Sequence, residues 1–174
     1  MDKLRNYDVS FSGMKTGRHQ FKFEIDKTFF QLFDTEQEFT NPKIAVDVFL
    51  EKHTTFLEFE IETYGTVELV CDITNEDFEY PIENDIKVLV KFGEEYDDSE
   101  EDVITIPTSD HALNVAQLIY ENVALSIPMK KVSPKVSDED LEILEKFSPK
   151  EVEEEKEPES DPRWEALKKL KDKN

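Results

Sequence analysis

The chain has 174 residues, 37% hydrophobic and 36% charged, with 13 Phe and a formal net charge of -21 at pH 7. This length and composition predict one domain with a real core, and only four Gly and eight Pro exclude a collagen-like or low-complexity chain. The charge disfavours phosphate backbones and favours basic partners, although an excess of acids also simply keeps a protein soluble.

Cys71 is the only cysteine, so no intramolecular disulfide can form and a reducing compartment fits. The N-terminal stretch MDKLRNYDVSFSG lacks the apolar segment of a signal peptide. No run of the chain approaches the ~18 apolar residues of a membrane span. We therefore expect a cytoplasmic protein with no membrane segment.

Apolar residues take every second position at the start of the chain, over residues 7–11 and again over residues 21–25. Each stretch is predicted to be a strand. The sequence GMKTG between them has Gly at both ends and predicts a hairpin connection. Residues 27–33, KTFFQLF, are interpreted as a helical turn.

A longer alternating block follows, and its apolar positions lie within residues 44–50, 57–61, 67–71 and 86–90. The connections EKHTT and TYGT are short, so these strands should be antiparallel neighbours. A parallel sheet would need crossover helices, for which there is no room. The alternation indicates one buried and one solvated face. We predict an α+β fold whose first half is a curved antiparallel β-sheet or open barrel.

The second half begins with seven acids between residues 92 and 102, which predict a solvated loop before one more short strand, VITIP. The period then changes. Apolar residues recur at three- and four-residue steps from Ala112 to Val123, which predicts an amphipathic helix with Ser109 as its N-cap. Pro128 marks where this helix must have ended. It should pack on the sheet and close the apolar face.

The remaining residues change character again. SDEDLEILEKF predicts a second short helix with Ser137 as N-cap, and the acidic run 149–160 predicts a flexible linker. We expect three parts, and their bounds are 1–132 for the sheet-plus-helix domain, 133–160 for an acidic linker with a short helix, and 161–174 for a basic terminal segment.

Catalytic signatures are missing from the sequence, which has no glycine-rich phosphate loop, HExxH or GxSxG. His19, His53 and His111 fall near predicted turns or a helix start and do not cluster, so no shared metal site is expected. The glutamates at 58, 60 and 62 are interpreted as a solvated sheet face. The chain is predicted not to be an enzyme and to need neither metal nor cofactor.

Three patches of the sequence stand out, and they are VELVCDIT, YENVALSIPMKKV and DPRWEALKKL. In this order and at these spacings they resemble the YceD-like family, named for large ribosomal RNA subunit accumulation. The terminal DPRW-x-x-L-x-x-L is the most specific piece and LSIPM the next, while the stretch before residue 40 matches only in pattern. The residues with a structural role in the family motif would be Cys71, Leu125, Ile127 and Pro128. The resemblance implies a ribosome-biogenesis factor.

The chain departs from that family in its cysteines. Many members carry Cys-x-x-Cys, where this chain has Cys71 followed by Thr74, and further cysteines after the proline, where this chain has none. One cysteine cannot supply the four ligands of a tetrahedral zinc site, so a metal role does not carry over. Because Cys71 alternates in phase with Val67 and Leu69, we interpret it as a small buried hydrophobe rather than a reactive thiol, which would need an activating cation.

The terminal segment has the pattern of an anchor peptide. Asp161 can cap a helix that has Pro162 in its first turn, with Trp164, Leu167 and Leu170 or Lys171 on one face. Large aromatic and Arg side chains often dominate interfaces. The predicted partner-binding residues are Asp161, Pro162, Arg163, Trp164, Leu167, Lys168, Lys169 and Leu170. The alternative is that this helix folds back and caps the acidic domain.

Two functional hypotheses follow. The first is a non-enzymatic ribosome-assembly factor that binds a large-subunit precursor, a basic ribosomal protein or an assembly factor, with direct contact to RNA left open. The second is an acidic mimic of nucleic acid that occupies the basic site of an enzyme, and it rests on the net charge alone. The sequence does not define the oligomeric state.

Overall fold

The computed structural model describes residues 2–33, 35–100, 102–137 and 146. The chain divides into two units, Met1–Pro134 and Lys135–Asn174, and every element described below belongs to the first. The predicted linker 149–160 and the terminal segment 161–174 lie outside the described residues, as does almost all of the helix predicted after Ser137. The predicted domain boundaries stay predictions.

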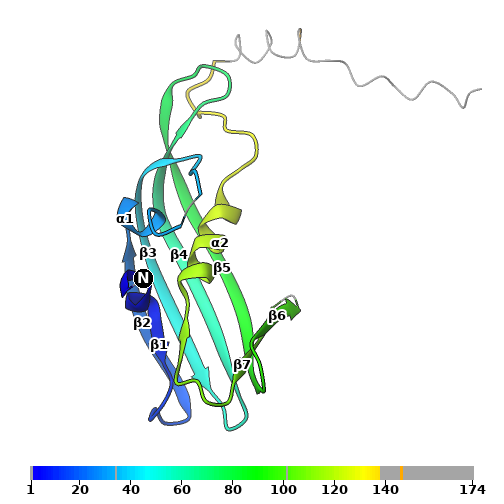
Figure 1. Ribbon diagram of the computed structural model, residues 1–174. Helices are drawn as coiled ribbons and strands as arrows, with labels where there is room; N and C mark the ends of the chain where they lie inside the picture. The colour runs from blue at the N-terminus through cyan, green and yellow to red at the C-terminus, as the bar shows by residue number, and fades with distance from the viewer. Residues whose placement is uncertain (1, 34, 101, 138–145, 147–174) are drawn as a thin grey trace, which may run out of the picture. The chain divides into compact units, whose positions relative to one another are not determined.

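Six strands form one curved, open sheet in the order β2-β3-β4-β5-β7-β6 (Figure 1). Neighbours from β2 to β5 are antiparallel. These findings confirm the predicted α+β fold with a curved antiparallel sheet and one main helix. The strands are β2 (Gly17–Ile25), β3 (Thr40–Lys52), β4 (Phe56–Val70), β5 (Asp77–Gly93), β6 (Asp97–Glu100) and β7 (Val103–Pro107).

The alternating pattern sorts side chains onto the two faces of the sheet. On β4, Leu57, Phe59 and Ile61 are at most 1% exposed. The β3 neighbours of Phe59 and Ile61, which are Leu50 and Val48, are buried with them. The glutamates between them point to the opposite face. Burying a side chain of this size stabilises the fold by about 1.5–3 kcal/mol, so this apolar face fixes the register of the strands.

The main helix, α2 (Ala116–Ser126), packs on β4 and β5, as predicted (Figure 1). It ends before Pro128, also as predicted. Its predicted beginning at Ser109 is wrong, because residues Ala112–Asn114 form a strand, β8, and the helix starts after Val115. The Asn114 side chain accepts a hydrogen bond from the Ala116 N–H at 3.1 Å and satisfies a free donor of the first turn.

The N-terminal hairpin prediction is wrong as well. A 3-10 helix, η1 (Asp2–Tyr7), leads into β1 (Asp8–Ser10), which pairs with β8 in a separate two-stranded sheet. β2 pairs along its whole length with β3 instead. The reason is burial, since Val9 is 0% exposed and lies opposite the buried Leu113, a partner more than a hundred residues away.

A third correction concerns TYGT, which is not a turn. β4 runs unbroken from Phe56 to Val70 through Gly65. This glycine has φ 154°, and a Cβ there would collide with the backbone of Lys43 and Ile44, beside the register shift between Thr40 and Lys43 on β3. Glycine therefore marks a close approach between two strands rather than a connection.

The acidic stretch 92–102 is exposed, but it is not only a loop, since it contains the edge strand β6. The predicted strand VITIP is confirmed as β7, which pairs parallel with the end of β5. No crossover helix is needed, because the parallel pairing covers only five residues, Leu89–Gly93 against Val103–Pro107. The chain returns through β6, which lies on the outer side of β7.

The predicted helical turn is confirmed as α1 (Lys27–Phe30), capped by Asp26, whose carboxylate accepts from the Thr28 N–H at 2.8 Å. Phe29 and Phe30 of α1 belong to a cluster of edge-on and stacked aromatic rings at one end of the core. The ring contacts are Phe29–Tyr7, Phe29–Phe30, Phe29–Phe33, Phe30–Phe39 and Phe33–Tyr120.

Candidate partner-binding surfaces

The predicted partner-binding residues of the terminus, from Asp161 to Leu170, lie outside the described residues. Their role stays a prediction. The four motif residues Cys71, Leu125, Ile127 and Pro128 are described, and they differ in burial. Cys71 is buried, Ile127 and Pro128 are half-buried, and Leu125 is 75% exposed.

Cys71 sits in a corner that joins the β4–β5 turn to the segment after α2. The turn closes on itself, with the Cys71 N–H donating to the Glu76 carbonyl at 2.8 Å. Two hydrogen bonds tie Asp72 to Lys131, one from the Asp72 N–H to the Lys131 carbonyl and one from the Lys131 N–H to the Asp72 carboxylate. Sequence reasoning found the motif patches but not that they meet here.

The thiol of Cys71 is buried, as its alternation predicted, and it accepts a hydrogen bond from the Ser133 N–H at 3.3 Å. That N–H, with smaller contributions from Thr74 and Ile73, lowers the pKa of the thiol from 9 to about 7, against the opposing effect of burial. The sequence analysis expected only a cation to lower it. Because the sulfur is enclosed, we assign this corner a structural role, holding the chain after α2 against the β4–β5 turn.

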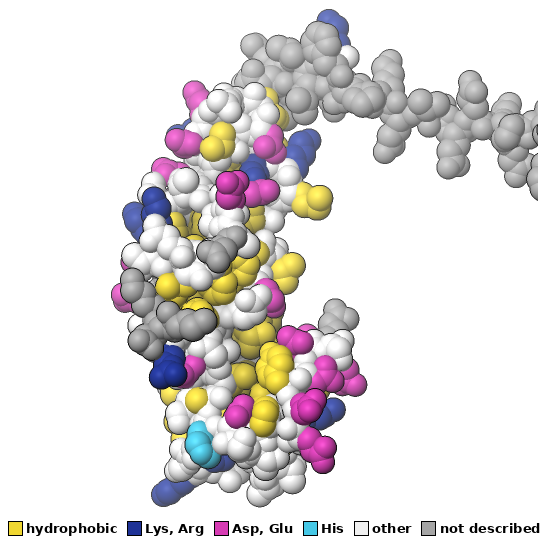
Figure 2. Space-filling view, viewed as in Figure 1, with side chains coloured by type: hydrophobic (Ala, Val, Ile, Leu, Met, Phe, Trp, Pro, Cys, Tyr) yellow, Lys and Arg dark blue, Asp and Glu magenta, His cyan; other side chains and the backbone are white. Residues whose placement is uncertain are grey.

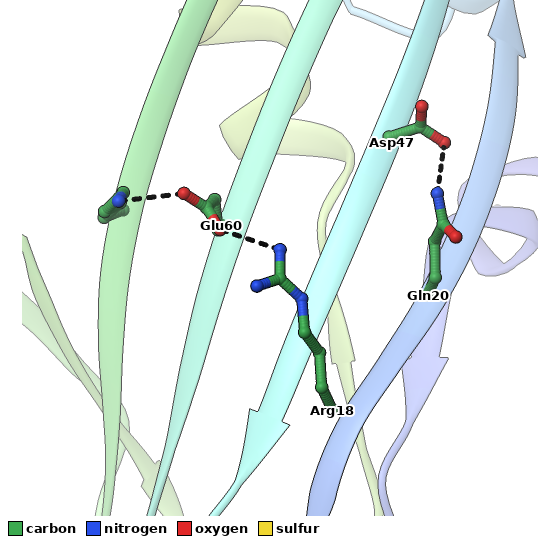
Figure 3. Close-up of polar contacts among 5 residues, drawn as sticks. Arg18, Gln20, Asp47 and Glu60 are labelled. Carbon is green, nitrogen blue, oxygen red and sulfur yellow. Dashed lines mark hydrogen bonds and ion pairs between the residues drawn. The ribbon is translucent and has the colours of Figure 1, made fainter.

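The outer face of the sheet carries ordered charge pairs (Figure 3). Glu60 on β4 lies between Arg18 at 3.2 Å and Lys87 at 2.8 Å, and Lys87 is the main cause that lowers the pKa of Glu60. Asp47 on β3 accepts from Gln20 at 3.1 Å and pairs with Lys22 at 2.9 Å. These ion pairs neutralise part of the solvated face, which is therefore not a bare acidic surface.

The inner face holds a groove of about 750 Å³, bounded by α2 on one side and by β6 and β7 on the other. Its apolar lining is visible as yellow side chains in the hollow of Figure 2. Asp and Glu side chains gather over β6 and β7. The apolar lining includes Ile86, Val88, Ile104, Ile106, Leu113 and Leu118. We call this hollow between α2 and the strands β6 and β7 the acidic groove.

Leu125 of the family motif also lines the acidic groove. The sequence did not predict this groove. The residues of β6 were interpreted as a loop, and the start of α2 was placed too early in the chain. The available signal was the dense run of acids around Tyr96, directly before a short apolar strand. Only the pairing of β6 with β7 brings these acids opposite α2.

The histidines do not form a metal site in the described part of the chain. His53 contacts Glu58 at 3.1 Å, whereas His19 bonds the Lys15 carbonyl at 2.8 Å. No group of three or more His, Cys, Asp or Glu suitable for a metal occurs among the described residues. That the fold needs no metal stays a prediction. None of the described helices is both long and apolar enough to cross a membrane.

The fold and these surfaces define an acidic α+β protein whose two sheet faces differ, one with paired charges and one with an open groove. Residues 59–171, well over half of the chain, match the profile of the family described as "Large ribosomal RNA subunit accumulation protein YceD". The chain belongs to this family, which confirms the resemblance found in the sequence. No curated protein and no solved structure gives a significant match.

Proposed function

We propose that this protein is a non-enzymatic, cytoplasmic factor of large-subunit biogenesis that acts by binding. Membership of a family named for accumulation of large-subunit ribosomal RNA carries the proposal. The net charge of -21 supports basic components, namely ribosomal proteins or assembly factors on a precursor particle, as the direct partners. Naked RNA is disfavoured as a partner by the same charge.

The cellular test is a sucrose-gradient profile of cells depleted of the protein, with the protein itself blotted across the fractions. We expect a selective loss of large subunits and the protein in fractions that contain their precursors. An unchanged subunit profile, together with a low-salt pull-down that recovers no ribosomal protein, ribosomal RNA or assembly factor, would overturn the proposal.

The terminal segment 161–174 is proposed as one anchor of this binding. Its sequence combines the aromatic Trp164 and the apolar Leu167 with two basic residues, Lys168 and Lys169, and this composition supports the proposal. We expect Trp164→Ala to remove about 2 kcal/mol of binding energy, roughly thirtyfold in affinity for precursor particles. Lys168→Glu with Lys169→Glu should weaken it too, most strongly at low salt, because salt screens exposed charges. Unchanged co-sedimentation of both variants would contradict an anchor.

A further inference from the structure

The acidic groove combines an apolar floor with exposed apolar side chains on both walls. Leu125 on α2 is 75% exposed, and Tyr96, immediately before β6, is 57% exposed. Half-buried Ile86 and Leu118 continue the apolar surface between them. Large apolar side chains are left open to water on opposite sides of one hollow, which is typical of a binding site for another polypeptide.

The charge of the groove is of one sign. Its lining has six carboxylates and, among the described residues, no Lys, Arg or His. They come from both walls and from the segments between, and they are Asp8, Asp98, Glu100, Asp102, Asp110 and Glu121. None of the six takes part in an ion pair within the described chain, whereas Glu60 and Asp47 on the outer face do.

Carboxylates on both walls of the acidic groove affect the same side chain, Tyr96. Partial burial raises the pKa of Tyr96, and the negative charges of Asp98 on β6 and Glu121 on α2 add to that effect. Besides burial, the carboxylates of both walls therefore contribute a negative potential at Tyr96. Such a potential repels phosphate and attracts a cationic side chain.

We propose that the acidic groove binds a basic, amphipathic segment of a partner protein, with apolar side chains on the floor and Lys or Arg against the six carboxylates. The negative charge and the apolar floor together favour this occupant. A purely basic segment would leave the floor exposed, and a purely apolar segment would leave the carboxylates unpaired. The identity of the partner as a ribosomal protein or assembly factor rests on the proposed function. The basic, amphipathic character of its segment rests on the groove alone.

The test is fluorescence anisotropy of the full chain with a labelled 14-residue peptide of Leu and Lys arranged at helical spacing. We expect saturable binding that weakens about tenfold in Leu125→Ser and in Glu121→Lys. Val70→Ser and Glu83→Lys make the same chemical changes at exposed positions outside the groove, and they should change affinity less than about twofold. Equal weakening in groove and control variants, or no saturable binding, overturns the proposal.

Two further probes separate other occupants. A peptide of the same length with Lys and Ser should bind much more weakly, and equal binding would overturn the amphipathic requirement. If Trp164→Ala strengthens binding of the Leu and Lys peptide, the chain's own terminal segment competes for the groove, and a partner segment is not its normal occupant. Groove-dependent peptide binding with an unchanged subunit profile after depletion would leave the groove standing and reject the biogenesis role.

Discussion

Asn122 is a polar residue of α2 that is 0% exposed, and it fastens the helix to the sheet. Its amide nitrogen donates to the Thr63 hydroxyl at 2.8 Å and the Ile61 carbonyl at 3.2 Å, while its oxygen accepts from Asn84 at 2.6 Å. Removing one member leaves buried partners without hydrogen bonds, which costs more than the bond itself contributed.

We therefore expect Asn122→Ala to lower the free energy of unfolding by about 1–3 kcal/mol, measured by thermal or urea denaturation. Gln117→Ala is the matched control, because Gln117 lies on the same helix but is exposed, and its side chain donates a hydrogen bond to Glu121 in the same element. It should change stability by less than about 0.5 kcal/mol. Equal effects of the two variants would contradict the role of Asn122.

Asp47 predicts a pH dependence. Its hydrogen bond with Lys22 is the main cause that lowers the pKa of its carboxyl, helped by Tyr64 and Gln20. A lowered pKa in the folded state means that the stabilisation is fully present above the unfolded value of about 3.9 and is lost as the pH falls through the folded value.

Asp47→Asn should consequently be less stable than the parent chain at pH 6, and the difference should shrink as the pH falls below about 3.9. Urea unfolding at pH 6 and pH 3 measures it. The other carboxyl groups titrate alike in both proteins and cancel in the comparison. A stability difference that stays the same at both pH values would mean that the partners of Asp47 do not stabilise its ionised form.

At the scale of elements, Gly65 decides how β3 and β4 approach each other. A side chain there meets the backbone of β3, which cannot move without breaking the ladder. We expect Gly65→Ala to destabilise by at least about 3 kcal/mol, the upper range for a strained backbone position. Gly13→Ala separates strain from collision, because Gly13 also has a positive φ, 76°, but no atom lies within 4 Å of the position that a Cβ would take there.

Gly13→Ala should cost only about 1–2 kcal/mol by thermal denaturation. A smaller loss for Gly65→Ala than for Gly13→Ala would show that β3 and β4 can separate at this point.

Period-two alternation predicted the central strands well, because one face of these strands is buried, with α2 packed on β4 and β5, and every second residue must be apolar. It failed where pairing is distant or the strand carries no apolar face. β1 pairs with β8 across more than a hundred residues, and β6 is exposed along its whole length. Asn122 lay on the apolar side of the predicted helix, three residues after Ile119, and that polar exception was the one signal for the buried network.

At the scale of the whole molecule, the net charge was readable from the sequence, but its distribution was not. Cross-strand neighbours such as Lys87 and Glu60 neutralise part of the outer face, and only strand register brings them together. The carboxylates of the acidic groove come from segments as distant as Asp8 and Glu121. The outer face therefore carries ion-paired carboxylates, whereas those of the acidic groove take part in no ion pair among the described residues and are available to a basic partner.

The last prediction concerns the terminal part of the chain. The buried apolar residues of the described structure run from Val9 to Val123, so we expect the core to form without residues 150–174. Those residues contain seven basic and nine acidic side chains, so deleting them changes the net charge by only two units. We expect the deletion to leave the thermal midpoint within about 2 °C of the full chain, since 1 kcal/mol corresponds to roughly 2–4 °C at this size.

The same deletion should abolish the contribution of Trp164 to binding of precursor particles, so stability and function separate in one variant. The full chain supplies the control, because Trp164 is its only tryptophan and iodide quenching of its fluorescence reports contact with solvent. We expect free access of the quencher. A midpoint several degrees lower in the truncated chain, together with a protected tryptophan in the full one, would mean that the segment caps the acidic domain instead of binding a partner.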